Sequence, residues 1–167
     1  MIPNLVCLLI LAVFYILQST IFSRITLIAG ASDLILLFLL AWSLQEEVKN
    51  SWLWAVVAGV LISIGSAMPF FTPLVGYLGA VSISKLFQRR VWRNPLLAMF
   101  IVTFLGTLFQ HAVYAAGLIV SGAPIAWIES LDSVTIPSVL LNLIFALPIY
   151  AIVNDLAGRL YPLEVEV

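Results

Sequence analysis

The chain alternates long apolar runs with short polar breaks, and the runs contain almost no charged residues. A bilayer core about 30 Å thick requires about 20 apolar residues in a helix that rises 1.5 Å per residue. Six runs approach that length, and we expect each to form a membrane-spanning helix. They are residues 3–22, 32–45, 51–68, 73–87, 95–120 and 135–157. The predicted fold class is an all-α, polytopic membrane bundle that forms one domain over residues 1–167.

The second run, residues 32–45, is shorter than the others. Its length of about 14 residues gives roughly 21 Å of helix. This segment must therefore extend into its polar flank or be partly re-entrant. The preceding residues 25–30 are also apolar, which makes them a candidate for a loop that enters the membrane. Between the third and fourth runs, Pro69 and Pro73 interrupt helical hydrogen bonding and predict a tight hairpin.

Composition supports the membrane assignment, because 63% of the chain is hydrophobic and 9% is charged. A soluble domain carries roughly 25% charged residues. Membrane lipid is therefore the expected surroundings of the outer surface. The net charge of −1 and the seven Lys and Arg residues argue against nucleic acid as a partner.

The distribution of Lys and Arg predicts the orientation, because positive charge accumulates in cytoplasmic loops. The strongest cluster is Lys85, Arg89, Arg90 and Arg93. With this cluster inside and six spans, both termini are cytoplasmic. Lys49 and Arg159 then also fall inside, and only Arg24 falls outside.

Small residues recur at four-residue spacing on the third and fourth runs, a pattern that marks helix interfaces in lipid. The stripes are Ala55, Gly59, Ser63 and Ala67 on the third run and Gly76, Ala80 and Ser84 on the fourth. We expect the hairpin to bring the two stripes together. Docking of a partner's helix on a stripe is the alternative.

Polar residues also fall at helical spacing on the first, fifth and sixth runs, where they predict a polar seam inside the bundle. The candidates are Gln18, Thr107, Gln110, His111, Tyr114 and Asn142. Three interpretations are open: interhelical hydrogen bonding, a small polar ligand, and partner contacts. His111 is the only histidine and has no carboxylate three or four residues further on. A neutral, hydrogen-bonded histidine is therefore favoured over a proton relay.

Asp33 is predicted to cap the N-terminus of the second helix, where its side chain can accept hydrogen bonds from free backbone N–H groups. Arg24 lies on the same predicted outer side, so we also expect an ion pair between Arg24 and Asp33.

The sequence contains no pattern typical of catalysis. It lacks a nucleophile with a base, paired buried carboxylates, clustered metal ligands and a glycine-rich phosphate loop. We therefore expect a protein that is not an enzyme and that has no metal site and no cofactor.

Several segments, in order and spacing, resemble the rod shape-determining protein MreD family over nearly the whole chain. They are Gln18, the segment 32–38 (SDLILLF), Gly59-Val-Leu-Ile-Ser63, Gly76-Tyr-Leu-Gly79, the segment 136–142 (IPSVLLN) and Pro148-Ile-Tyr150. Two departures are visible. The family often has proline where this chain has Ser32 and an acidic residue where this chain has Ser63. Any role of that acidic residue in the family therefore does not transfer to this chain.

The resemblance implies a non-enzymatic scaffold of the bacterial cell-elongation machinery in the cytoplasmic membrane. Its implied partner is the bitopic protein MreC, with indirect links to MreB, a RodA-type glycosyltransferase and a penicillin-binding transpeptidase in peptidoglycan synthesis. The family is also similar in fold to the substrate-binding S subunits of energy-coupling-factor vitamin transporters. A transporter subunit that binds a vitamin is therefore the alternative function.

Overall fold

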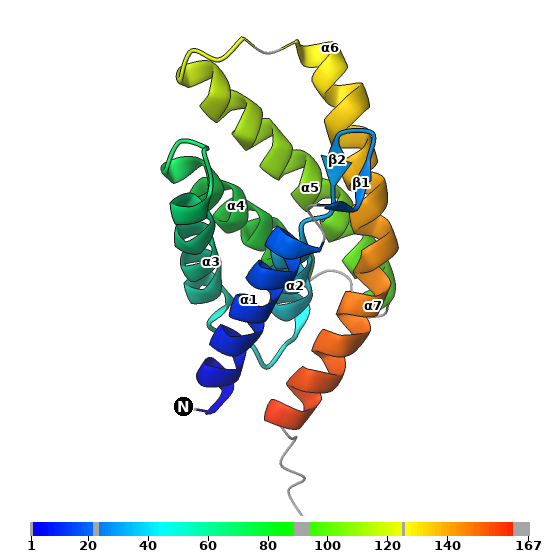
Figure 1. Cartoon of the computed structure of the whole chain (residues 1–167). Coiled ribbons are helices and arrows are strands. Elements are labelled where there is room, and N and C mark those ends of the chain that lie inside the picture. The colour runs from blue at the N-terminus through cyan, green and yellow to red at the C-terminus, as the bar shows by residue number, and fades with distance from the viewer. Residues whose placement is uncertain (1, 22–23, 89–93, 125, 162–167) are drawn as a thin grey trace, which may run out of the picture.

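The computed structural model describes residues 2–21, 24–88, 94–124 and 126–161, which form an all-α bundle (Figure 1). Its long helices are α1 (Ile2–Thr20), α2 (Leu34–Leu44), α3 (Ser51–Gly65), α4 (Phe71–Gln88), α5 (Pro95–Val120) and α7 (Ile136–Leu160). The smaller elements are β1 (Thr26–Leu27), β2 (Gly30–Ala31), α6 (Trp127–Ser130) and the π-helix η2 (Leu131–Thr135). Each of the six apolar runs therefore overlaps one long helix.

Part of the predicted inner surface lies outside the described residues. This part includes Arg89, Arg90 and Arg93 of the basic cluster and the C-terminal residues 162–167. Residues 22–23, at the end of the first predicted span, lie outside as well.

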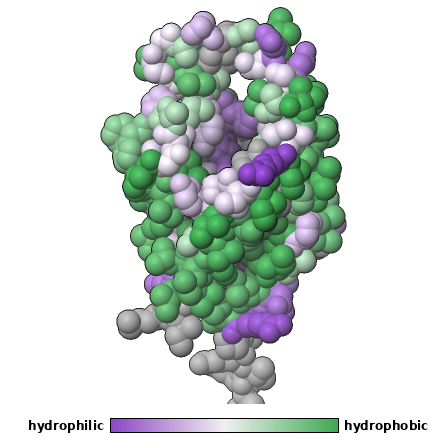
Figure 2. All heavy atoms as spheres, in the orientation of Figure 1, coloured by the Kyte–Doolittle hydropathy of each residue, from purple (hydrophilic) through white to green (hydrophobic). Residues whose placement is uncertain are grey.

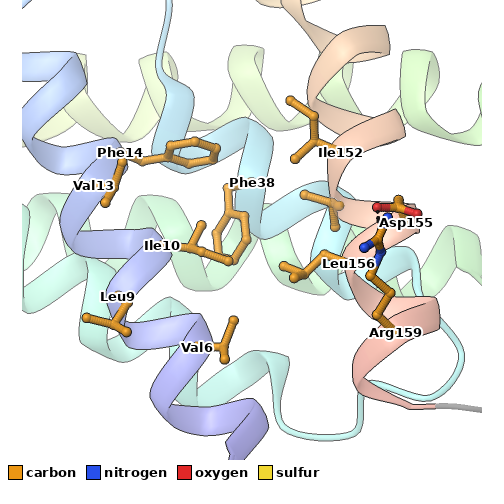
Figure 3. A pocket seen from close by; sticks show the side chains of 11 residues that line it. Val6, Leu9, Ile10, Val13, Phe14, Phe38, Ile152, Asp155, Leu156 and Arg159 are labelled. Carbon is orange, nitrogen blue, oxygen red and sulfur yellow. Dashed lines mark ion pairs between the residues drawn. The ribbon is translucent and has the colours of Figure 1, made fainter.

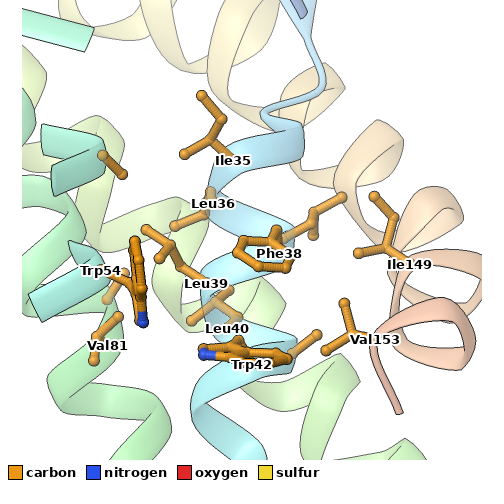
Figure 4. Close-up of a cluster of buried hydrophobic side chains, with 14 of the residues drawn as sticks. Ile35, Leu36, Phe38, Leu39, Leu40, Trp42, Trp54, Val81, Ile149 and Val153 are labelled. Carbon is orange, nitrogen blue, oxygen red and sulfur yellow. The ribbon is translucent and has the colours of Figure 1, made fainter. Parts of the chain in front are cut away.

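Helix α2 lies at the centre of the bundle and is buried from Leu34 to Ser43. A helix that is apolar on all sides requires neighbours on all sides, and α2 packs against α1, α3, α4, α5 and α7. Figure 4 shows its side chains pointing in several directions, towards Trp54 of α3, Val81 of α4 and Val153 of α7. The core of the protein is therefore built around this one short helix.

Helix α2 does not extend into its polar flanks, because both flanking residues, Asp33 and Gln45, have extended backbones. Its 11 residues give a length of about 16 Å, roughly half of a bilayer core.

The segment before α2 forms a small antiparallel hairpin in which Thr26 pairs with Ala31 and Leu27 with Gly30. Ile28 at its turn has a φ of 59°, in the left-handed region. The hairpin packs on the start of α7, where the Ala31 N–H donates to Ser138 Oγ at 3.1 Å. A Cβ atom on Gly30 would lie 2.6 Å from the Ser138 nitrogen. Glycine at this position therefore permits the close contact between hairpin and helix.

The predicted small-residue stripe on α3 packs inside the molecule. Ala55, Gly59 and Ser63 are buried, and a Cβ atom on Gly59 would lie 2.6 Å from the Leu74 Cα atom of α4. Ser63 Oγ donates to the Gly59 carbonyl oxygen at 2.6 Å. Ala67 follows the end of α3 and is exposed, so it does not belong to the packed face.

The stripe on α4 is buried too, but the expectation that it would meet the stripe on α3 is wrong. Gly76 faces Gln110 and Tyr114 of α5. Ser84 Oγ accepts a hydrogen bond from Ser43 Oγ of α2 at 2.5 Å. Because α4 lies between α3 on one side and α2 and α5 on the other, its small residues bring it close to α2 and α5.

Three helical segments are long and apolar enough to cross a membrane: Pro3–Thr20, Pro95–Val120 and Ile128–Leu160. The third segment joins most of α6 with η2 and α7 into one continuous helical stretch. Large apolar side chains remain exposed on the outside of the bundle, and Figure 2 shows hydrophobic residues over most of the visible body. Soluble proteins rarely expose apolar surface on this scale. The fold is therefore compatible with a membrane protein.

Candidate functional site

The carboxylate of Asp33 is the centre of a polar network at the start of α2. Its Oδ1 atom accepts a hydrogen bond from the Leu36 N–H at 2.9 Å, which is the predicted N-cap. Its Oδ2 atom accepts from Tyr77 Oη of α4 and from Gln110 Nε2 of α5, both at 2.8 Å. A carboxylate inside an apolar bundle is costly unless donors replace its water. Three donors from three helices surround this one.

Asn142 of α7 is the second branching point of the network. Its Oδ1 atom accepts from Ser32 Oγ and from the Asp33 N–H, both at 2.9 Å. Its Nδ2 atom donates to Thr107 Oγ1 of α5 at 3.0 Å. The side chain is 1% exposed, so these contacts take the place of water. Asn142 therefore joins α7 to α5 and to the residues that cap α2.

Gln18 of α1 completes the cap, because its Oε1 atom accepts from the Ile35 N–H at 3.3 Å. The N-terminal N–H groups of a helix have no partner within the helix. Here the N–H groups of Asp33, Ile35 and Leu36 find side-chain oxygens from Asn142, Gln18 and Asp33 itself. The polar residues of α1 and α7 thus meet the hydrogen-bonding needs of the buried end of α2.

The structure brings together five of the six residues predicted for the polar seam. They are Gln18, Thr107, Gln110, Tyr114 and Asn142. Tyr114 joins through its hydroxyl, which accepts from Gln110 Nε2 at 3.0 Å. His111 lies apart from this network, and its Nδ1 atom contacts Thr135 Oγ1 at 3.2 Å.

The expected ion pair between Arg24 and Asp33 does not form. Arg24 is exposed, and the ion pair in the described part of the chain joins Arg159 to Asp155 at 2.9 Å. The physical reason is that the Asp33 carboxylate turns into the bundle, where Tyr77 and Gln110 serve as neutral donors.

Sequence reasoning missed Tyr77 as a partner of Asp33. Tyr77 is fully buried within an otherwise apolar stretch of α4, and a tyrosine there must find a partner for its hydroxyl group. That requirement was the available signal. It indicates that a partner exists, but it does not say that the partner is the carboxylate at the start of α2.

The network offers hydrogen bonding rather than the arrangement of a catalytic site. Asp33 is the one carboxylate in it, and its side-chain partners are neutral. Among the described residues, no group of three or more His, Cys, Asp and Glu side chains is placed to hold a metal ion. This arrangement is best suited to holding five helices, α1, α2, α4, α5 and α7, in fixed positions relative to one another.

A second feature is an apolar groove of about 490 Å³ between α1 and α7 (Figure 3). Leu9 and Val13 line its α1 side, Ile152 and Leu156 line its α7 side, and Phe38 of α2 lies between the two helices. The Asp155–Arg159 pair lies on the α7 side of the groove.

Helix α1 is held loosely, and this leaves the groove open. In its most apolar window, 11% of the residues are buried within the molecule, compared with 39% for α5. Its contacts with α2 include the edge-to-face pair of Phe14 and Phe38, whose ring centroids are 5.5 Å apart.

The fold and the network define the class of this protein: an all-helical bundle with apolar helices compatible with a membrane and a polar junction at its centre. Comparison of the chain with protein-family models, curated proteins and solved structures finds no significant match. Membership of the MreD family therefore stays a prediction from the residues.

The network predicts that Asn142 contributes strongly to stability. Asn142→Ala removes three hydrogen bonds that join α7 to α5 and to the residues capping α2. At about 0.6 kcal/mol for each bond in a membrane bundle, we expect a loss of about 2 kcal/mol. Denaturant-induced unfolding of the detergent-purified protein measures this loss. Asn154→Ala, at an exposed position of the same helix, is the control and should change stability by less than about 0.5 kcal/mol. Equal effects of the two substitutions would contradict the assignment.

Proposed function

We propose that this protein is a non-enzymatic scaffold of the bacterial cell-elongation machinery that binds MreC in the cytoplasmic membrane. Through MreC it is linked to MreB, to a RodA-type glycosyltransferase and to a penicillin-binding transpeptidase. The supporting observation is that segments resembling the MreD family, far apart in sequence, meet at one place. Gln18, Ser32-Asp33, Tyr77 and Asn142 belong to four such segments, and all four contribute to the network around the start of α2.

In this proposal the six long helices all lie within the membrane, with both termini in the cytoplasm. Lys49 and Lys85 then face inwards together, and the Lys85 Nζ atom donates to the Val48 carbonyl oxygen at 2.9 Å across the loop between α2 and α3. The connection between α5 and α7 faces outwards. Its residues 121–133 include Glu129 and Asp132 but no Lys or Arg, which agrees with the accumulation of positive charge inside.

This topology predicts the behaviour of reporter fusions. Alkaline phosphatase inserted after Gly122 should be active, because this loop is placed outside, where the enzyme can form its disulfides. Green fluorescent protein fused to the C-terminus should fluoresce in the cytoplasm. An inactive phosphatase at Gly122 together with an active phosphatase at the C-terminus would contradict the orientation.

The groove between α1 and α7 is the feature that fits a partner's single helix best. Helices associate in lipid through close packing rather than through the hydrophobic effect. A groove with apolar sides and with Phe38 between them offers such packing to one transmembrane helix. The small-residue stripes are less suitable, because six of their seven residues are already buried within the molecule.

Substitutions on α1 test this docking site with a matched pair. Leu9→Trp places a large ring in the groove, whereas Leu8, also an exposed leucine, does not line the groove. We expect Leu9→Trp to reduce the MreC that co-purifies with the tagged protein in mild detergent about tenfold, a loss of about 1.4 kcal/mol. We expect Leu8→Trp to retain MreC.

Two results would count against these claims. Equal retention of MreC by both variants would exclude the groove as the binding site. If the unsubstituted protein retained neither MreC nor an elongation synthase, the scaffold function itself would be contradicted.

A further inference from the structure

On the side of the Asp33 network away from the groove between α1 and α7, a hollow lies beneath the connection between α5 and α6. Figure 2 shows it near the top of the molecule, with hydrophilic residues in its depth. Two adjoining cavities of about 200 Å³ each lie here between α5 and η2. They share His111, Ala115, Ser130 and Thr135. The packing between α5 and η2 therefore leaves room for a small molecule.

The lining of this hollow combines an aromatic ring with hydrogen-bonding groups. Tyr114 lines the first cavity, together with the hydroxyl-bearing Ser130 and Thr135. The contact between His111 Nδ1 and Thr135 Oγ1 leaves Nε2 as the ring nitrogen available to a ligand. Small-molecule sites typically combine apolar walls with a few polar groups of this kind.

The backbone at this place is unusual as well. Leu131–Thr135 forms the π-helix η2 within the continuous helical segment Ile128–Leu160. π-helical segments are rare and are often found at functional sites. This segment carries Thr135 towards His111 and forms one wall of both cavities. The irregular helix and the hollow are thus parts of the same feature.

One carboxylate, that of Asp33, is linked to the lining of the hollow by hydrogen bonds. Tyr114 Oη accepts from Gln110 Nε2, and the same nitrogen donates to Asp33 Oδ2, so the Asp33 carboxylate lies behind Tyr114, two hydrogen bonds away through Gln110. Among the described residues, no Lys or Arg side chain lines either cavity.

From these observations we infer that the hollow binds a small organic cation that carries a hydroxyl or another polar group. The Asp33 carboxylate behind Tyr114 favours a positive ligand, and the Tyr114 ring offers a face to an alkylammonium group. The hydroxyl groups of Ser130 and Thr135 and the free nitrogen of His111 hydrogen-bond to its polar end. The combined volume suits a small metabolite rather than a peptide. This site is independent of the groove between α1 and α7 and of the proposed partner.

Two probes of equal shape separate charge from size. Choline carries a trimethylammonium group, and 3,3-dimethylbutan-1-ol carries an uncharged tert-butyl group in its place. We expect choline to bind the purified protein in neutral-lipid nanodiscs at least tenfold more tightly, as measured by isothermal titration calorimetry or saturation-transfer NMR. Asp33→Asn should reduce this preference for the cation.

A matched pair on α5 locates the binding. Ala115→Phe fills the hollow that Ala115 lines, whereas Ala116 is exposed and lines neither cavity. We expect Ala115→Phe to weaken choline binding at least tenfold and Ala116→Phe to change it less than twofold. Thermal unfolding of both variants reports whether they are folded.

Either of two outcomes would overturn the inference. Choline could bind no more tightly than its uncharged counterpart, or a folded Ala115→Phe variant could bind choline as well as the unsubstituted protein. Because Ala115 lies outside the groove between α1 and α7, loss of choline binding with full retention of MreC would separate this site from the proposed scaffold function.

Discussion

The free N–H groups at the buried start of α2 are the constraint on which the rest of the structure depends. A helix that is apolar on every side must be surrounded by protein, and its first turn then has no water to bond with. Asp33 caps the Leu36 N–H, Gln18 reaches the Ile35 N–H from α1, and Asn142 reaches the Asp33 N–H from α7. The charge that this cap introduces is in turn held by Tyr77 and Gln110. The helices α1, α4, α5 and α7 thus each have a defined position relative to α2.

The two candidate binding features are arranged around the same short helix. Phe38, in the middle of α2, lies between the two sides of the groove formed by α1 and α7. Asp33, just before α2, lies behind Tyr114, which lines the hollow beside α5 and η2.

Much of the fold could be predicted from the sequence, because uninterrupted apolar runs have few alternatives to helices in lipid. The N-cap role of Asp33 was also predictable, since a carboxylate directly before an apolar run suits a helix start. Its partners were not. Pairing Asp33 with Arg24 relied on opposite charge and on a shared position on the predicted outer side, whereas burial selected the neutral donors Tyr77 and Gln110 from helices far along the chain.

The packing of small residues shows the same limit. Four-residue spacing correctly marked Gly59 and Gly76 as places of close approach. Spacing alone could not tell that α4 turns its small face towards α2 and α5, because that choice depends on how three other helices are placed. His111 was grouped with Gln110 by sequence position, yet the two side chains point to different partners.

A double-mutant cycle between Asp33 and Tyr77 tests the central claim most directly, because it isolates the contact that joins the cap of α2 to α4. Stability is measured for Asp33→Ala, for Tyr77→Phe and for the double variant, with Asp33→Ala and Ser84→Ala as a control pair. We predict a coupling free energy of at least about 0.6 kcal/mol for Asp33 and Tyr77 and a value near zero for the control pair. A coupling near zero for Asp33 and Tyr77 would contradict the central role of this network.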